Sequence, residues 1–281
     1  MVKAIETVEA TMSNLLKHEL FSRRYAILGW GVGMALFEMM YLSIIPEMGE
    51  QMKTLADLPL YEKMGIDMGS FEGFIASSVI GTLTLMLGIY AIMTSTETLA
   101  GEEDRGTLEL IVATPLSRWR IVSAKAAAVS VAALLILAIA GVPSAFVLRA
   151  IKTSVEIDVT PVQLFWATLS VWPLTVTLLM LGLFLGAYLP NRRTAALVVT
   201  VVFIASYLGE MLTGFVQSLD FAKPLSLFYY FDSTAAMFSQ GAQPRDLAVL
   251  FGLAALFFVL ALLSFQRRDI TVGAWPWQRA R

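Results

Sequence analysis

The chain has 281 residues, of which 57% are hydrophobic and only 15% are charged, and its formal net charge is −2. An ordinary soluble domain has roughly a quarter of its residues charged, so this composition excludes a soluble globular protein and indicates a chain surrounded largely by lipid. With no cysteine and a single histidine, His18, the sequence offers no basis for a thiolate or histidine metal site or a cysteine nucleophile, and nothing in its charge favours nucleic-acid binding.

The first predicted element covers residues 1–24 and is an amphipathic helix lying in the cytoplasmic membrane interface. Charged residues separate apolar residues that recur at helical spacing, namely Ile5, Val8, Met12, Leu15, Leu16 and Leu20. A disordered tail is the alternative. The stretch lacks the basic start and the continuous apolar centre of a signal peptide, so we expect the N-terminus to remain in the cytoplasm.

Six stretches are apolar over about 20 residues or more, the length that a helix needs to cross a hydrocarbon core about 30 Å thick. They cover residues 25–45, 73–95, 121–149, 162–189, 194–216 and 247–266. Lipid offers no partner to backbone N–H and C=O groups, so these spans should be α-helices, and the short alternating strands of a membrane barrel are missing. The sequence therefore predicts an all-α integral membrane protein with a single transmembrane domain over residues 1–281.

The lysines and arginines predict the orientation of these helices. Of the 20 basic residues, 14 precede the first span, lie between the second and third or the fourth and fifth spans, or follow the sixth. The other six are Lys53, Lys63, Arg149, Lys152, Lys223 and Arg245. The positive-inside rule therefore places both termini of this multi-pass protein in the cytoplasm, and we expect it in the cell membrane.

Two acidic residues, Glu38 and Glu210, lie in the outer parts of the first and fifth spans. Charges inside a membrane are costly, so both are candidate substrate-path residues. Snorkelling to the outer surface, or pairing with a base in a loop, is the alternative. Residues 217–246 are too polar for a full crossing and too apolar for a solvated loop, which predicts short helices that either re-enter the outer leaflet or cap the bundle externally.

Prolines and small residues inside the spans predict helix shape and packing. Pro143 and Pro173 should kink the third and fourth spans. Two pairs of glycines at i and i+4 permit close helix approach, and packing inside one subunit is favoured over a seam between subunits. These pairs are Gly29 with Gly33 and Gly182 with Gly186.

The cytoplasmic segment of residues 97–118 differs in composition from both flanking spans. A short amphipathic helix is predicted within it, and a simple connecting loop is the alternative. This helix would start at Gly106 and Thr107 and end before Pro115. Its apolar face would consist of Leu108, Ile111 and Val112. Three consecutive acids, residues 102–104, would then precede the N-terminus of this helix, where the helix dipole favours negative charge.

This segment resembles the permease subunits of ATP-binding-cassette exporters of the second type, which carry a characteristic motif after the second span. The matching residues are Glu103, Gly106, Thr107, Leu108, Glu109, Pro115, Ser117, Arg118 and Lys125. The residues after the last span also look like the usual ending of that family, namely Phe265, Arg267, Arg268 and Asp269. Together with the six-span layout, the resemblance extends over nearly the whole chain.

The resemblance implies that the chain forms half of a substrate pathway, as a homodimer or with a related permease, while separate ATPase subunits bind ATP and Mg²⁺. The short helix would be a coupling helix that docks into a groove of the ATPase through Leu108, Ile111 and Val112. We assign no catalytic residue, cofactor site or metal site to this chain, which has no G-x-x-x-x-G-K-[ST] phosphate-binding loop. The expected partners are the ATPase, a second permease and membrane lipid.

Two other functions are compatible with six membrane spans. A non-transporting accessory or signalling subunit could use the same ATPase contact to move an external element. An ion-coupled secondary carrier would need ion sites near the middle of the membrane and no ATPase. The coupling motif argues against the carrier, and the short external loops weigh against the accessory subunit.

Overall fold

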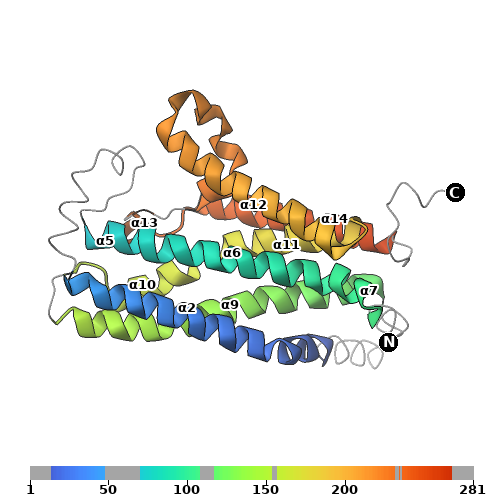
Figure 1. The fold of residues 1–281 in the computed structure, drawn as a ribbon, viewed down its shortest axis with the longest axis horizontal. Helices are drawn as coiled ribbons and strands as arrows, with labels where there is room; N and C mark the ends of the chain where they lie inside the picture. The colour runs from blue at the N-terminus through green and yellow to red at the C-terminus, as the bar shows by residue number, and fades with distance from the viewer. Residues whose placement is uncertain are drawn as a thin grey trace.

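The computed structural model describes residues 14–47, 70–107, 117–153, 157–231, 234 and 236–267. The elements in these ranges are helices, and no strand occurs among them. Six of the helices are long and apolar enough to cross a membrane, which confirms the predicted all-α fold class. Figure 1 shows them side by side, with α12 leaning away from the rest of the bundle at one end.

The second crossing helix runs without interruption through five segments. They are α5 (Phe71–Phe74), η2 (Ile75–Ile80), α6 (Gly81–Thr96), η3 (Glu97–Gly101) and α7 (Glu102–Asp104), of which η2 and η3 are π-helical. The predicted span ended at residue 95. The three acids at 102–104 therefore form the last turn of this long helix, whereas the sequence placed them in a cytoplasmic loop. The helix that they were predicted to precede lies largely outside the described ranges.

The other elements have bounds close to the predicted spans, except where the fourth span is divided. The crossing helices are α2 (Arg24–Ile44), α9 (Arg118–Ile151), α10 (Pro161–Leu169) with α11 (Trp172–Tyr188), α12 (Arg192–Phe215) and α14 (Pro244–Gln266). Short helices follow α2 and connect α12 to α14, namely η1 (Ile45–Glu47), η4 (Gln217–Leu225), η5 (Phe228–Tyr230) and α13 (Ala236–Gln240).

The fourth crossing is interrupted at Ser170 and Val171, between α10 and α11. Pro173 has no N–H to donate to the carbonyl four residues earlier, and its ring crowds that carbonyl, so the helix ends and starts again with proline in its first turn. The α10 segment begins at a capping box, in which Thr160 accepts from the Gln163 N–H and Gln163 accepts from the Thr160 N–H. The α9 helix, in contrast, continues through Pro143.

Helix α11 lies at the centre of the bundle and contacts α6, α9, α12 and α14. Gly182 permits the contact with α6, because a Cβ atom there would lie 1.9 Å from Oγ of Ser95. Gly186 similarly faces Ala100. The predicted packing of this glycine pair inside one subunit is therefore what the structure has.

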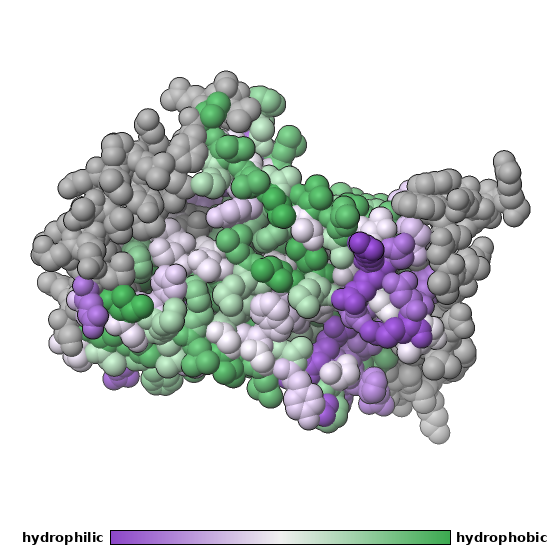
Figure 2. All heavy atoms as spheres, viewed as in Figure 1, coloured by the Kyte–Doolittle hydropathy of each residue, from purple (hydrophilic) through white to green (hydrophobic). Residues whose placement is uncertain are grey.

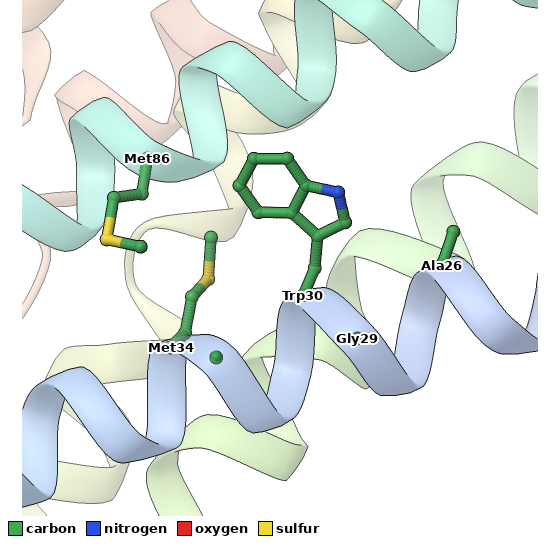
Figure 3. A pocket seen from close by; sticks show the side chains of 6 residues that line it. Ala26, Gly29, Trp30, Met34 and Met86 are labelled. Atoms are coloured by element: carbon green, nitrogen blue, oxygen red, sulfur yellow. The ribbon is translucent and has the colours of Figure 1, made fainter.

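The other glycine pair, Gly29 with Gly33, packs against nothing, since a Cβ atom at either position would meet no atom within 4 Å. The close approach on α2 is made instead by Gly31, beside Ile139 of α9. Gly29 and Gly33 line an apolar groove between α2 and α6, together with Trp30 and Met86 (Figure 3). The prediction of packing within the subunit was wrong for this pair, because these two glycines and Gly31 point to opposite sides of the helix.

The surface divides into an apolar middle and a polar end. Figure 2 shows hydrophobic side chains over the middle of one face and hydrophilic side chains gathered at the end that holds α7. A chain that crosses a membrane is expected to have this distribution. Residues 14–22 are helical at the same end and turn at Arg23 into α2, whereas residues 1–13 of the predicted interfacial helix lie outside the described ranges.

Candidate functional site

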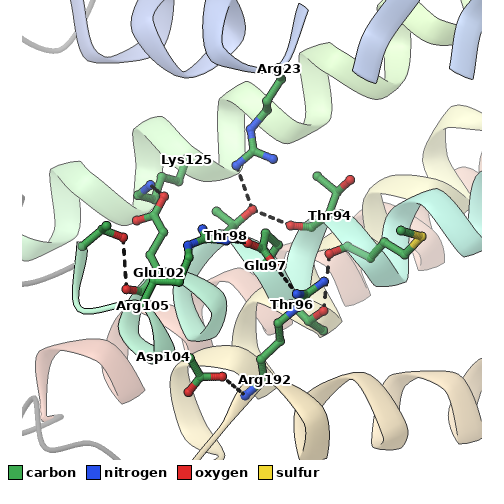
Figure 4. A network of polar contacts seen from close by, with 12 residues as sticks. Arg23, Thr94, Thr96, Glu97, Thr98, Glu102, Asp104, Arg105, Lys125 and Arg192 are labelled. Atoms are coloured by element: carbon green, nitrogen blue, oxygen red, sulfur yellow. Dashed lines mark hydrogen bonds and ion pairs between the residues drawn. The ribbon is translucent and has the colours of Figure 1, made fainter. Parts of the chain in front are cut away.

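Eight charged residues meet at the end of the bundle where α7 lies, and we refer to them as the polar cluster (Figure 4). They are Glu19, Arg23, Glu97, Glu102, Asp104, Arg105, Lys125 and Arg192. These residues come from the helix of residues 14–22, the second crossing helix, α9 and α12, so the cluster joins four parts of the chain. Its charges balance, with four acids and four bases.

Lys125 forms the centre of one half of the polar cluster and has no exposed surface. Its Nζ atom lies 2.7 Å from Oε1 of Glu19 and 2.6 Å from Oε1 of Glu102. Arg23 completes this half, with Nη2 at 3.5 Å from Glu19 and 3.1 Å from Oγ1 of Thr98. A buried ammonium group is tolerated only when it is paired, and here two carboxylates from different segments supply the charge.

Glu97 forms the centre of the other half. It pairs with Arg105 in the same helix and, at 2.5 Å, with Nη1 of Arg192 at the start of α12. The backbone N–H of Arg192 also donates to Oδ2 of Asp104, at 3.2 Å. Gly101 leaves room for the carboxylate of Glu97, because a Cβ atom at position 101 would lie 2.7 Å from Cδ of Glu97.

The acids of α7 stand at the C-terminal end of a helix, where the helix dipole disfavours negative charge. Glu102 and Asp104 are compensated by Lys125 and by the N–H of Arg192. Glu103, a motif residue, is 4% exposed and is therefore also enclosed by protein. The last turn of the second crossing is thus stabilised by its neighbours more than by its own helix.

Gly106 ends this helix, with φ at +70°, a conformation that glycine adopts without the strain that other residues incur. Its N–H donates to the carbonyl of Glu103, at 2.9 Å. Thr107 is again helical, and its hydroxyl donates to the carbonyl of Glu102, at 3.1 Å. The glycine therefore provides the turn between the second crossing and the segment that follows it.

Ser117 and Arg118 stand at the start of α9, where Ser117 is the N-cap residue. The Arg118 guanidinium donates to the carbonyl of Phe265, at 3.2 Å, at the end of α14. A base at this position satisfies a carbonyl that the helix leaves unpaired and interacts favourably with the helix dipole. Arg118 therefore joins the start of the third crossing to the end of the sixth.

The remaining residues predicted to couple the chain to a partner lie outside the described ranges. They are Leu108, Glu109, Ile111, Val112 and Pro115. Their apolar face stays a prediction from the sequence. The structure does describe both ends of the segment that contains them, and both ends are attached to the bundle, at Thr107 and at Ser117.

Glu38 on α2 and Glu210 on α12 both lie away from the polar cluster. Glu38 has no exposed surface, and one of its carboxylate oxygens accepts from Oγ1 of Thr168 in α10, at 3.3 Å. Glu210 is partly exposed on α12, and the charge of Lys223 in η4 acts on it. Glu38 therefore does not snorkel to the surface, whereas the pairing of Glu210 with a loop base stays a prediction.

The sequence revealed the motif but not the partners of its lysine, Lys125. Lys125 was expected to close the motif, and its pairing with Glu19 and Glu102 was not foreseen. One signal was available, since acids precede the first span and end the second at the same membrane depth as this lysine. That signal predicts an interfacial location for each residue but not which helices are neighbours.

The geometry of the polar cluster suits the transmission of force. Apart from the local pair of Arg23 with Glu19, each ion pair of the cluster joins residues of different segments or holds the end of the second crossing in place, so these segments must move together or exchange partners. Removing one partner would leave a buried charge uncompensated.

A family model described as ABC-2 family transporter protein matches residues 13–270. No curated protein sequence matches the chain. Because the family match includes all six crossing helices and the polar cluster, the chain belongs to the ABC-2 family of transporter proteins, as a membrane permease, and the resemblance noted in its sequence is confirmed.

Proposed function

We propose that this chain is the permease subunit of an ATP-driven exporter and that it receives mechanical work from a separate ATPase subunit. Permeases of this family generally work with such a subunit. In this proposal the ATPase binds ATP and Mg²⁺ and docks on residues 97–118 at the cytoplasmic side, where both termini also lie. The permease acts as a homodimer or together with a related permease in the cell membrane.

The observation that carries this proposal is the attachment of the coupling segment to the crossing helices. The polar cluster ties the first part of the segment to α9, through Glu102 and Lys125, and to α12, through Glu97 and Arg192. Arg118, the last residue of the segment, is tied to α14. A displacement of this segment by a docked ATPase would therefore be distributed over several crossings at once.

The substrate path is proposed to form between two permeases, with Glu38 and Glu210 as its candidate polar residues. Glu210 is the better placed of the two, because α12 exposes most of its side chains whereas Glu38 is enclosed by protein. An exposed crossing helix is the part of a subunit that a second subunit can cover.

Co-purification tests the proposal. The full chain, carrying an affinity tag, is purified from its native membranes, and the co-eluting proteins are identified and quantified. We expect an ATPase with a phosphate-binding loop in equal amount. Elution of the permease without an ATPase would contradict the proposal and would favour an ion-coupled carrier.

Substitution in the coupling segment tests the docking face. Leu108→Asp or Ile111→Asp places a charge in an apolar contact, so we expect the permease to insert normally but the co-purified ATPase to fall at least about tenfold. Ala113→Asp is the matched control, because at 100° per residue it lies on the opposite side of the predicted helix. Normal ATPase recovery with Leu108→Asp, or equal loss with Ala113→Asp, would contradict the assigned face.

A further inference from the structure

A second cavity, of about 490 Å³, lies among α10, α11, α13 and α14. It is located at the end where α10 begins and α13 lies, opposite the end that holds α7 (Figure 1). None of its lining residues belongs to the polar cluster or to the coupling segment. Its volume falls within the range of about 300–1,000 Å³ that small-molecule sites occupy.

Aromatic rings form much of the wall of this cavity. They are Trp166, Trp172, Tyr230, Phe231, Phe238 and Phe251. Trp172 and Phe251 meet edge to face, with ring centroids 5.8 Å apart, and the indole N–H of Trp172 donates to the carbonyl of Ser130, at 2.9 Å. This hydrogen bond uses the polar atom of the ring, so the ring contributes its face and its apolar edge to the cavity.

Asp246 is the charged side chain of the cavity, and among the described residues that line it there is no lysine, arginine or histidine. No ion pair of Asp246 occurs within the described part of the chain. The residue lies in the first turn of α14. The one charged group among the described lining residues is therefore a carboxylate.

The amide of Gln163, also in the lining, is already engaged. Its Nε2 atom donates to the carbonyl of Phe238, at 2.8 Å, and its Oε1 atom accepts from the N–H of Thr160, at 2.8 Å. The carboxylate of Asp246 is therefore the strongest polar group that the cavity offers to a ligand. Aromatic faces attract cations through the ring quadrupole, so the carboxylate and the rings favour the same sign of charge.

We propose that this cavity binds a lipophilic organic cation, whose charge is neutralised by Asp246 and whose apolar groups lie against the aromatic rings. A neutral lipid tail would use the same walls but would be indifferent to the carboxylate. The proposal goes beyond the transport function and does not depend on it, because binding to the cavity requires no ATPase.

Two ions of the same shape and opposite charge provide the test. The purified full chain in detergent is dialysed to equilibrium against tetraphenylphosphonium or tetraphenylborate, and the saturable binding of each ion is measured. We expect the phosphonium cation to bind at least about tenfold more tightly than the borate anion. Equal saturable binding of both ions would identify a cavity for neutral apolar groups and would overturn the proposal.

Variants of the cavity make the test specific. Asp246→Asn should weaken binding of the phosphonium cation by on the order of tenfold, and Asp246→Glu should retain it. Asp158→Asn, an exposed acid before α10 that does not line the cavity, is the matched control and should bind the cation normally.

A further variant removes an aromatic face but keeps an apolar side chain at the same position. Trp166 is 64% exposed, so the Trp166→Leu protein should fold normally. Its binding of the phosphonium cation should be weaker by roughly fivefold. Cation binding that is unchanged in both Asp246→Asn and Trp166→Leu would place the cation elsewhere and would overturn the proposal. Because the ATPase takes no part in this experiment, its outcome is independent of the co-purification test.

Discussion

Lys125 is stable in its buried position only while both of its carboxylate partners are present. An ammonium group with no exposed surface loses its hydration, and the two acids replace that stabilisation. The lysine is also the residue through which the helix of residues 14–22 and the end of the second crossing are held to the same point of α9.

We expect Lys125→Met to destabilise the protein by about 3–5 kcal/mol, because it leaves the carboxylate of Glu102 without its ion-pair partner and Glu19 with only the more distant Arg23. Adding Glu19→Gln and Glu102→Gln should recover most of this loss. Thermal unfolding of the solubilised protein measures both effects. Arg120→Met is the matched control, since Arg120 stands in the same helix outside the polar cluster. An unchanged melting temperature for Lys125→Met would show that this lysine is solvated.

At the scale of single residues, the sequence predicted the motif and a helix boundary at Gly106, which it interpreted as the start of a helix, but it could not predict the ion pairs. A glycine's role depends on its own backbone angles, and its neighbours in sequence indicate a turn. An ion pair such as Glu19 with Lys125 joins residues 106 positions apart, so it depends on helix neighbours that periodicity does not reveal.

At the scale of helices, the contact between α6 and α11 depends on the absence of a side chain at Gly182. In lipid, helices associate by close packing because apolar surface gains little by leaving one apolar environment for another. The hydroxyl of Ser95 fills the space over this glycine and bonds to the carbonyl of Ala91 in its own helix, at 2.6 Å.

Gly182→Ala should therefore destabilise the protein by roughly 1–3 kcal/mol, because the added methyl group overlaps Ser95. Gly29→Ala is the matched control, since the structure leaves open space at Gly29 and alanine is the better helix former. Thermal unfolding distinguishes the two, and Ser95→Gly combined with Gly182→Ala should restore stability. Equal melting temperatures for the two alanine variants would mean that α6 and α11 are not in close contact.

The existence of the helices was predictable, and their ends were less so. Length and hydropathy predict a crossing because the membrane imposes both, which is why all six helices were recognised. The continuation of the second helix to Asp104 depends on partners outside that helix, and the division of the fourth span depends on how the bundle accommodates Pro173. These tertiary effects override local preference.

At the scale of the whole molecule, the distribution of charge distinguishes the two ends of the bundle. The polar cluster lies at one end, and the cavity with Asp246 lies at the other. The positive-inside rule predicts that the first of these is the cytoplasmic end. The proposed ATPase contact is possible only in this orientation.

Labelling of single cysteines tests the orientation, and the chain suits it because its sequence has no cysteine. Thr107→Cys and Ser239→Cys place exposed thiols at opposite ends of the bundle. In intact cells, a membrane-impermeant maleimide should label Ser239→Cys at once and Thr107→Cys only after permeabilisation. The reverse pattern would invert the molecule and remove the coupling segment from the ATPase.

The interruption of the fourth crossing divides that crossing into two parts with different neighbours. The longer part, α11, contacts α6, α9, α12 and α14. The shorter part, α10, has nine residues and packs mainly on α9 and α13. Several residues of α10, among them Trp166, form a wall of the aromatic cavity. A ligand too large for the cavity would therefore displace α10, while α11 and the helices around it kept their positions.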